Sequence, residues 1–143
     1  MDRVAAVILL RRSDGAALLQ HRDDKPGLRH PGMWVPPGGH AEEGESMLDC
    51  AHRELLEETE YRAGELNFVA NLHDTAPGFA TNALTIYWAW YDGVQTIVCH
   101  EGQALEFVDR QSAGALAIPA PLLAAWDSAL RLAFPPSVNQ PST

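Results

Sequence analysis

The chain has 143 residues, of which 46% are hydrophobic and 20% are charged, and these proportions indicate one globular domain rather than a disordered or fibrous chain. Ten basic and 19 acidic residues give a formal net charge of −9, with Lys25 as the single lysine, which argues against a nucleic-acid-binding surface. Because no apolar stretch is long enough for a membrane span or a signal peptide, we expect a cytoplasmic protein that does not bind membranes.

Aliphatic and β-branched residues at positions 4–10 predict a strand that is buried on both faces, in the middle of a sheet. A turn signal at 13–15 joins it to a second strand over 16–22, which predicts a hairpin. Two prolines and two glycines within residues 23–32 predict a loop. The run Pro-Pro-Gly-Gly at 36–39 is expected to stop any regular element.

Helix-forming residues predict a helix that begins near Ser46 and ends near Glu60. Ser46 followed by Asp49 three residues later has the form of a capping box, which would satisfy the free N–H groups of the first turn. Three apolar residues at helical spacing are predicted to face the core: Leu48, Ala51 and Leu55.

The second half of the chain alternates apolar segments with turn signals. Four strands are predicted from their aliphatic and aromatic residues, at positions 66–72, 84–91, 95–99 and 106–108. A second amphipathic helix is predicted over 121–134. Because there is no internal repeat and no long linker, we expect a single domain over 1–134 and a flexible tail over 135–143.

The two cysteines, Cys50 and Cys99, form no C-x-x-C pair, so neither a zinc knuckle nor a dithiol redox motif is expected. We predict that both are buried thiols in a reducing compartment. Cys99 is followed by His100, but adjacent residues of a strand point to opposite faces, and thiol catalysis is therefore not favoured.

Three carboxylates of the first predicted helix, Glu54, Glu57 and Glu58, lie on one face because they are three and four residues apart. Like charges at these spacings cost about 0.2–0.5 kcal/mol per pair on an isolated helix. A divalent cation such as Mg²⁺, which prefers oxygen ligands, would offset this repulsion. The residues alone leave another interpretation open, in which Arg53 pairs with Glu57 and Arg62 with Glu58 on an ordinary solvated face.

Fixed residue types recur over positions 39–61. In order they are Gly39, Glu45, Arg53-Glu54-Leu55, Glu57-Glu58 and Tyr61, separated by five, seven, one and two residues. This pattern resembles the Nudix box, G-x5-E-x7-R-E-U-x-E-E-x-G-U, in which U is a bulky apolar residue. The order of the strands and the closing helix are also similar to the Nudix fold. The resemblance implies an α/β fold in which a mixed β-sheet is sandwiched between α-helices.

One position departs from the Nudix box, because Glu60 stands where the pattern has glycine. That glycine commonly ends a helix in the left-handed conformation, which costs a residue with a Cβ atom about 1 kcal/mol. The helix is therefore expected either to accept this cost or to run on towards Gly64. The carboxylates that precede this position are all present.

The resemblance implies a site for Mg²⁺, with Mn²⁺ as the alternative. Its implied ligands are the carbonyl oxygen of Gly38 and the carboxylates of Glu54, Glu57, Glu58 and Glu101. Arg53 would orient these carboxylates. Gly39 would support the loop and Glu45 would support either the loop or a contact with Arg53, although an acidic residue before a helix is also favoured by the helix dipole.

Glu101 is the weakest of these assignments. The segment Glu101-Gly102-Gln103 is similar to the one that brings a distant glutamate to the metal in MutT-type enzymes, whereas an ordinary loop glutamate is simply solvated. If Glu101 reaches the ion, then Glu54, Glu58 and Glu101 are all candidates for the general base.

A nucleotide also needs a stacking surface and a cationic partner. The aromatic candidates are Trp34, Phe79 and Trp88, of which we favour Trp34 because it precedes the glycine pair. Aromatic side chains are more often part of a core. Arg22 is a candidate for a phosphate contact, with an ordinary surface charge as the alternative.

The resemblance implies hydrolysis of a diphosphate linkage in a small nucleotide, and a MutT-type nucleoside triphosphate pyrophosphatase is our first expectation. Pro77, sixteen residues after Tyr61, is similar to a proline of the ADP-ribose pyrophosphatase subgroup, so hydrolysis of ADP-ribose or a nucleotide sugar is the second. A non-catalytic, nucleotide-sensing module is the third. The expected partner is a small nucleotide, and a homodimer is possible.

Overall fold

The computed structural model describes residues 1–136, so the predicted tail over 135–143 lies, from residue 137 on, outside the described residues. The chain forms seven strands, two α-helices and one 3₁₀ turn in this part. They are β1 (Arg3–Leu10), β2 (Ala17–His21), β3 (Trp34–Val35), β4 (Gly38–His40), α1 (Met47–Thr59), β5 (Asn67–Asp74), β6 (Asn82–Trp90), β7 (Ala104–Val108), η1 (Ser112–Ala115) and α2 (Ala120–Ala133). No helix among residues 1–136 has the length and apolarity needed to cross a bilayer.

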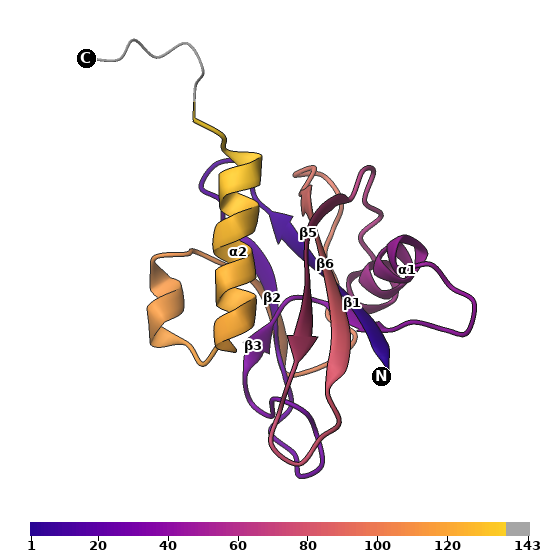
Figure 1. Cartoon of the computed structure of the whole chain (residues 1–143). Helices are drawn as coiled ribbons and strands as arrows, with labels where there is room; N and C mark the ends of the chain where they lie inside the picture. Colours follow the sequence, from indigo (N-terminus) through magenta and orange to yellow (C-terminus); the bar gives the residue numbers. More distant parts are fainter. Residues whose placement is uncertain (137–143) are drawn as a thin grey trace.

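All seven strands belong to one mixed sheet, in which the central order is β3-β2-β1-β6-β5. β1 runs parallel to β6 and antiparallel to β2, while β4 pairs with β1 and β7 with β2. The helices α1 and α2 lie on opposite faces of this sheet (Figure 1). The expected α/β fold with a mixed sheet between helices is therefore confirmed.

β1 is the centre of this arrangement because its side chains serve two cores. Alternate residues of a strand point to opposite faces. Ala6, Ile8 and Leu10 belong to the core on the α2 side, and Ala5, Val7 and Leu9 belong to the core on the α1 side. Burying a side chain of the size of leucine stabilises the fold by about 1.5–3 kcal/mol. The prediction of a mid-sheet strand buried on both faces is confirmed.

The helix α1 begins where the sequence predicts. The hydroxyl of Ser46 accepts a hydrogen bond from the backbone N–H of Asp49 at 3.1 Å. The prediction that Leu48 faces the core is wrong, since 43% of Leu48 is exposed. The buried stripe is centred on Cys50 and Ala51, and Leu48 lies at its margin when each residue advances the helix by 100°.

The same helix ends at Thr59, so the alternative in which it runs on to Gly64 is wrong. Glu60 adopts the left-handed conformation, with φ 62° and ψ 11°, and its N–H donates to the carbonyl of Leu56. The turn brings Tyr61 into the α1-side core, where the residue is buried. The Tyr61 hydroxyl donates to the carbonyl of Trp90 at 3.1 Å, and this anchoring offsets the cost of the glutamate's conformation.

Residues 95–99 form no strand, contrary to the prediction. This segment instead supplies N–H groups to the end of α1, because Val98 donates to the carbonyl of Thr59 at 3.0 Å and His100 to that of Glu58 at 3.2 Å. Helix ends leave such carbonyls without partners. The thiol of Cys50 is buried, as expected, but Cys99 lies in this extended segment and is exposed.

The glycine pair does not stop regular structure, which corrects a further prediction. Residues 38–40 form β4, in which Gly38 pairs with Ala6 and Gly39 with Ala5. A Cβ atom on Gly38 would collide with the carbonyl oxygen of Ala5, so only glycine permits this close pairing. The glycines therefore allow a strand at this point rather than interrupt one.

Replacing Glu60 with glycine should raise the free energy of unfolding by about 1 kcal/mol, because glycine adopts the left-handed conformation without steric cost. The variant also loses the contact between Glu60 and His100, but a pair this exposed contributes little. Urea unfolding measures the difference. Glu65→Gly, at an exposed position without positive φ, is the matched control. A destabilised Glu60→Gly variant would contradict this account of the helix end.

Candidate functional site

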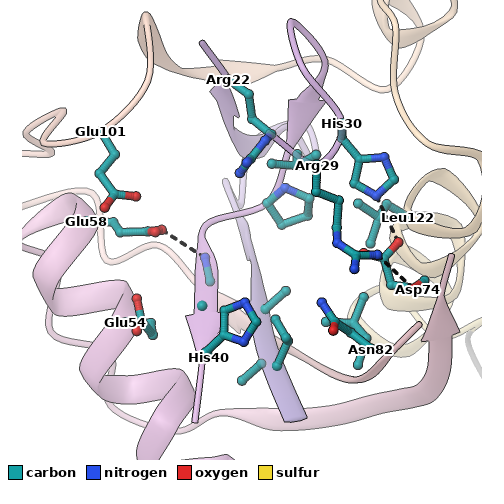
Figure 2. A pocket seen from close by; sticks show the side chains of 18 residues that line it. Arg22, Arg29, His30, His40, Glu54, Glu58, Asp74, Asn82, Glu101 and Leu122 are labelled. Carbon is teal, nitrogen blue, oxygen red and sulfur yellow. Dashed lines mark hydrogen bonds and ion pairs between the residues drawn. The ribbon is translucent and has the colours of Figure 1, made fainter. Parts of the chain in front are cut away.

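A cavity of about 410 Å³ is lined by residues of both α1 and α2 (Figure 2). One side is acidic and carries Glu54 and Glu58 from α1 and Glu101 from the loop before β7. β4 contributes Gly38, Gly39 and His40. The opposite side carries residues that the sequence did not single out: Arg29, His30, Asp74, Asn82 and Leu122.

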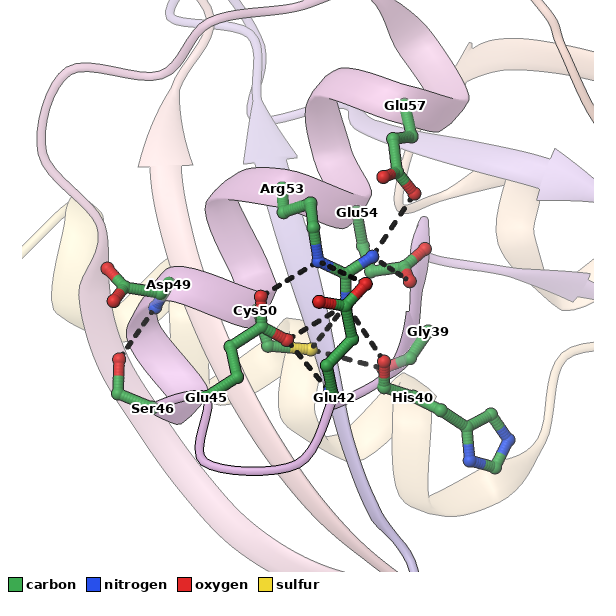
Figure 3. Close-up of polar contacts among 10 residues, drawn as sticks. All are labelled: Gly39, His40, Glu42, Glu45, Ser46, Asp49, Cys50, Arg53, Glu54 and Glu57. Atoms are coloured by element: carbon green, nitrogen blue, oxygen red, sulfur yellow. Dashed lines mark hydrogen bonds and ion pairs between the residues drawn. The ribbon is translucent and has the colours of Figure 1, made fainter.

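Arg53 connects the loop before α1 to the acidic helix face (Figure 3). Its guanidinium donates twice to Glu45, at 2.8 and 2.9 Å, and once to the carbonyl of His40 at 3.0 Å. It also donates to Glu54 at 2.8 Å and to Glu57 at 3.2 Å. Arginine has five N–H donors, and here each of them has an acceptor. Arg53 therefore fixes the orientation of the Glu54 carboxylate.

Glu45 is the strongest partner of Arg53. The bidentate contact with the guanidinium, together with a hydrogen bond from the N–H of Glu42 at 3.0 Å, lowers the pKa of Glu45 to about 2. The charged form of this carboxylate is thus favoured. Glu45 fixes Arg53, and Arg53 in turn fixes the acidic helix face.

Glu58 is buried, with only 6% of its surface exposed. One carboxylate oxygen accepts a hydrogen bond from the backbone N–H of Gly38 at 2.9 Å. Burial, followed by the neighbouring carboxyl groups of Glu101 and Glu54, raises the pKa of Glu58 well above its ordinary value. The solvated interpretation of this helix face is therefore wrong for Glu58, and within residues 1–136 Arg62 makes no ion pair with it.

Glu54 lies directly against Gly39. A Cβ atom at Gly39 would overlap the Glu54 carboxylate, so a residue larger than glycine would displace it. Burial raises the pKa of Glu54, and the contacts with Arg53 oppose this effect. The glycine of β4 and the carboxylate of α1 are thus mutually adapted.

The acidic side of the cavity has the chemistry of a site for a hard divalent cation. It offers carboxylate oxygens from Glu54, Glu58 and Glu101, and burial raises the pKa of Glu54 and of Glu58. Among residues 1–136, no three His, Cys, Asp or Glu side chains are placed so that they could hold a metal ion by themselves, as a site made of protein ligands alone. Mg²⁺ does not need one, because it keeps several waters and shares the oxygens of substrate phosphates. These residues therefore fit such a cation.

Two predicted site residues lie elsewhere. Glu57 is 57% exposed at its side chain and does not line the cavity; Arg53 holds it at the outer edge of the helix face. Trp34 stacks on the ring of His21, with centroids 4.5 Å apart, and is also absent from the cavity lining. Their roles as metal ligand and stacking residue remain predictions.

The other aromatic candidates also lie away from the cavity lining. Trp88 packs in the α2-side core, edge to face with Trp90, as most aromatic residues of a strand do. Phe79 is exposed and lies under the guanidinium of Arg29, at 5.2 Å from the ring centroid. Phe79 therefore contacts a residue that lines the cavity but does not line the cavity itself.

Arg22 does line the cavity, as a phosphate-binding residue would. Its Nε atom is buried and has no hydrogen-bond partner within the described part of the chain. A buried donor without a partner is rare in native proteins. The guanidinium is thus available to an anionic ligand that enters the cavity.

The side opposite the carboxylates depends on contacts between two loops. Arg29 donates to the carbonyl oxygens of Asp74, at 3.0 Å, and Ala80. The imidazole of His30 contacts the carboxylate of Asp74 at 2.9 Å. The charged residues of the loop over 23–32, which is rich in proline and glycine, could have indicated a functional role in the sequence. Nothing local in the sequence indicates that this loop meets the end of β5.

Comparison with known proteins identifies the family of the chain. The family model described as "NUDIX domain" matches residues 1–126. The chain is 47% identical over 57 residues to the m7GpppN-mRNA hydrolase NUDT17 of Danio rerio. This match covers 39% of this chain and 18% of that protein. The chain thus spans less than a fifth of that relative's length.

Two solved structures show the same fold. The MutT protein of Methanosarcina mazei superposes with a TM-score of 0.78 at 17% identity, over 93% of this chain and 95% of that one. An Ap4A hydrolase of C. elegans also gives 0.78, at 21% identity, over 93% and 98% of the two chains. At these identities the similarity concerns the fold alone.

Replacing Glu45 with glutamine should lower the free energy of unfolding at pH 7, because the amide removes a charged bidentate partner of Arg53. The pKa of Glu45 is about 2 in the folded chain against an ordinary 4.5. The advantage of the wild type should therefore be complete above about pH 5 and disappear as the pH falls towards about 2.

Urea unfolding between these limits measures the effect. Glu43→Gln, at an exposed position with no ion pair among residues 1–136, controls for the loss of one negative charge. A difference between wild type and Glu45→Gln that stays constant on acidification would contradict the assigned role of the ion pair.

Proposed function

Because the chain belongs to the NUDIX domain family, as the match over residues 1–126 shows, we propose that it hydrolyses the diphosphate linkage of a small nucleoside diphosphate derivative. The proposed cofactor is Mg²⁺, with Mn²⁺ as the alternative. The observation that carries this proposal is the meeting of Glu54, Glu58 and Glu101 in one cavity with the unpartnered guanidinium of Arg22.

We assign a different role to each group of residues in and around the cavity. Glu54, Glu58 and Glu101 would hold the cation, together with the carbonyl oxygen of Gly38. Such a cation withdraws charge from phosphate oxygens and lowers the pKa of water. Arg22 would bind a phosphate oxygen that the cation does not reach. Arg53 acts as a positioning residue, because it fixes Glu54 without lining the cavity.

Among possible substrates we propose a nucleoside triphosphate, which would yield a monophosphate and pyrophosphate as in MutT-type enzymes. The support is the loop glutamate, since Glu101 lines the cavity beside Glu58. A volume of about 410 Å³ lies within the usual range of small-molecule sites. Pro77 gives less support to the ADP-ribose alternative, because it lies in the turn where the N–H of Phe79 donates to the carbonyl of Ala76 and turns commonly contain proline.

Product analysis separates these alternatives. The wild type is incubated with Mg²⁺ and nucleoside triphosphates, nucleotide sugars, ADP-ribose or dinucleoside polyphosphates, and the products are identified by ³¹P NMR. Pyrophosphate from a triphosphate is the expected result. Two monophosphates from ADP-ribose or a nucleotide sugar would support the second reading. Binding without turnover across the panel would instead favour the non-catalytic nucleotide-sensing module.

Replacing Glu58 with glutamine should reduce kcat by about a hundredfold or more, because an amide neither ligates a cation as an anion nor accepts a proton. The fold should persist. Burial already favours the neutral acid at this position, and glutamine keeps an oxygen that can accept the hydrogen bond from Gly38.

Steady-state kinetics and thermal unfolding are measured together. Glu43→Gln removes an exposed carboxylate outside the cavity and should behave as the wild type does. Turnover of Glu58→Gln within a few-fold of the wild type, with Tm unchanged, would exclude Glu58 from the reaction.

A further inference from the structure

Asn82 is a buried polar residue of the cavity, and the proposed reaction assigns no role to it. It begins β6, lines the cavity and is only 6% exposed. Its side-chain amide makes no hydrogen bond with residues 1–136, and it points into the cavity (Figure 2). Its amide atoms are reachable from the cavity, since Arg22 Nε is the one buried side-chain nitrogen or oxygen without a hydrogen-bond partner among residues 1–136. A ligand group that enters the cavity can therefore replace the water that hydrates this amide.

The neighbouring polar groups do not compete for this amide. Asp74 is the partner of Asn82 in the register of β5 and β6. Its carboxylate is already engaged by His30 at 2.9 Å and by Arg29 at 3.6 Å. Arg29 is further held by the carbonyl of Ala80. The amide of Asn82 is thus left free because its surroundings are satisfied among themselves.

Apolar side chains also lie near Asn82. Leu84 lies two residues further along β6 and so on the same face, and Leu122 enters from α2; both line the cavity and are buried in the α2-side core. An apolar wall beside a free amide suits a flat heteroaromatic ring, and the charged groups beside Asn82 are already paired with one another. The amide offers an acceptor and donors side by side, which match the edge of a nucleobase.

The position of this amide relative to the carboxylates completes the argument. Glu54, Glu58 and Glu101 lie on one side of the cavity and Asn82 lies across it (Figure 2). We propose that Asn82 is a specificity-determining residue that hydrogen-bonds to the nucleobase of a nucleotide whose phosphates face the carboxylates. This inference rests on the proposed function for the placement of the phosphates, but base binding can be measured without turnover.

The test is equilibrium binding of AMP, GMP and ribose 5-phosphate, in the presence of Mg²⁺, by calorimetry. These compounds lack the diphosphate linkage, so the result does not depend on whether the chain hydrolyses anything. The variants are Asn82→Asp and Asn82→Leu. The matched control is Asn71→Asp, the same change on the neighbouring strand at an exposed residue outside the cavity, where aspartate can still accept the hydrogen bond from Thr85.

In the wild type, at least one nucleotide should bind more tightly than ribose 5-phosphate. Asn82→Asp should shift the ratio of Kd values towards GMP by about tenfold or more, because a carboxylate accepts from the adjacent N1–H and N2–H groups of guanine but repels the acceptor on the edge of adenine. Asn82→Leu should remove the advantage of the nucleotides over ribose 5-phosphate without lowering Tm. Asn71→Asp should leave all three affinities unchanged.

Three results would overturn the inference. They are equal binding of ribose 5-phosphate and the nucleotides by the wild type, no binding of either nucleotide, and an unchanged AMP to GMP ratio in a folded Asn82→Asp variant. Binding of AMP or GMP through Asn82, together with no turnover of the triphosphates, nucleotide sugars, ADP-ribose and dinucleoside polyphosphates, would refute the proposed function and leave this inference standing.

Discussion

The site depends on one cation placed among several anions, the guanidinium of Arg53. Its contacts with Glu45, Glu54 and the carbonyl of His40 join the loop after β4 to the first half of α1. Without it, the acidic residues of this region would repel one another and the loop would lose its anchor. Arg53 makes no ion pair with Glu58 among the described residues, and burial raises the pKa of Glu58. A divalent cation bound beside Glu58 would stabilise the ionised form that burial disfavours.

The cavity takes its two sides from opposite layers of the fold. The carboxylates come from α1 and from the loop before β7, whereas Asn82 and Leu122 lie on the α2 side. The sheet between the layers keeps these groups at a set separation. A ligand that spans the cavity can therefore place charged and aromatic parts in different environments, which is the physical basis for treating cleavage and base selection as separate functions.

Local features were predictable because their causes are local. The cap at Ser46, the central strand β1 and the positions of β5, β6 and α2 follow from capping chemistry and from the periodicity of apolar residues. The predictions that proved wrong concern contacts between residues that are distant in the sequence. Residues 95–99 have strand composition but complete the end of α1 instead of joining the sheet, and Gly38 forms a strand because it fits against Ala5. Neither contact is visible from neighbouring residues.

The sequence by itself determined the set of acids on one helix, the arginine that accompanies them and the glycines before them, because helical geometry converts spacing into a common face. The tertiary structure decided which acids share the cavity. It buries Glu58, places Glu101 and the half-buried Glu54 in the same cavity, leaves Glu57 at the edge and brings Asn82 to the opposite side. Such placements depend on packing between distant segments. A pattern of residue types does not show which distant segments come into contact.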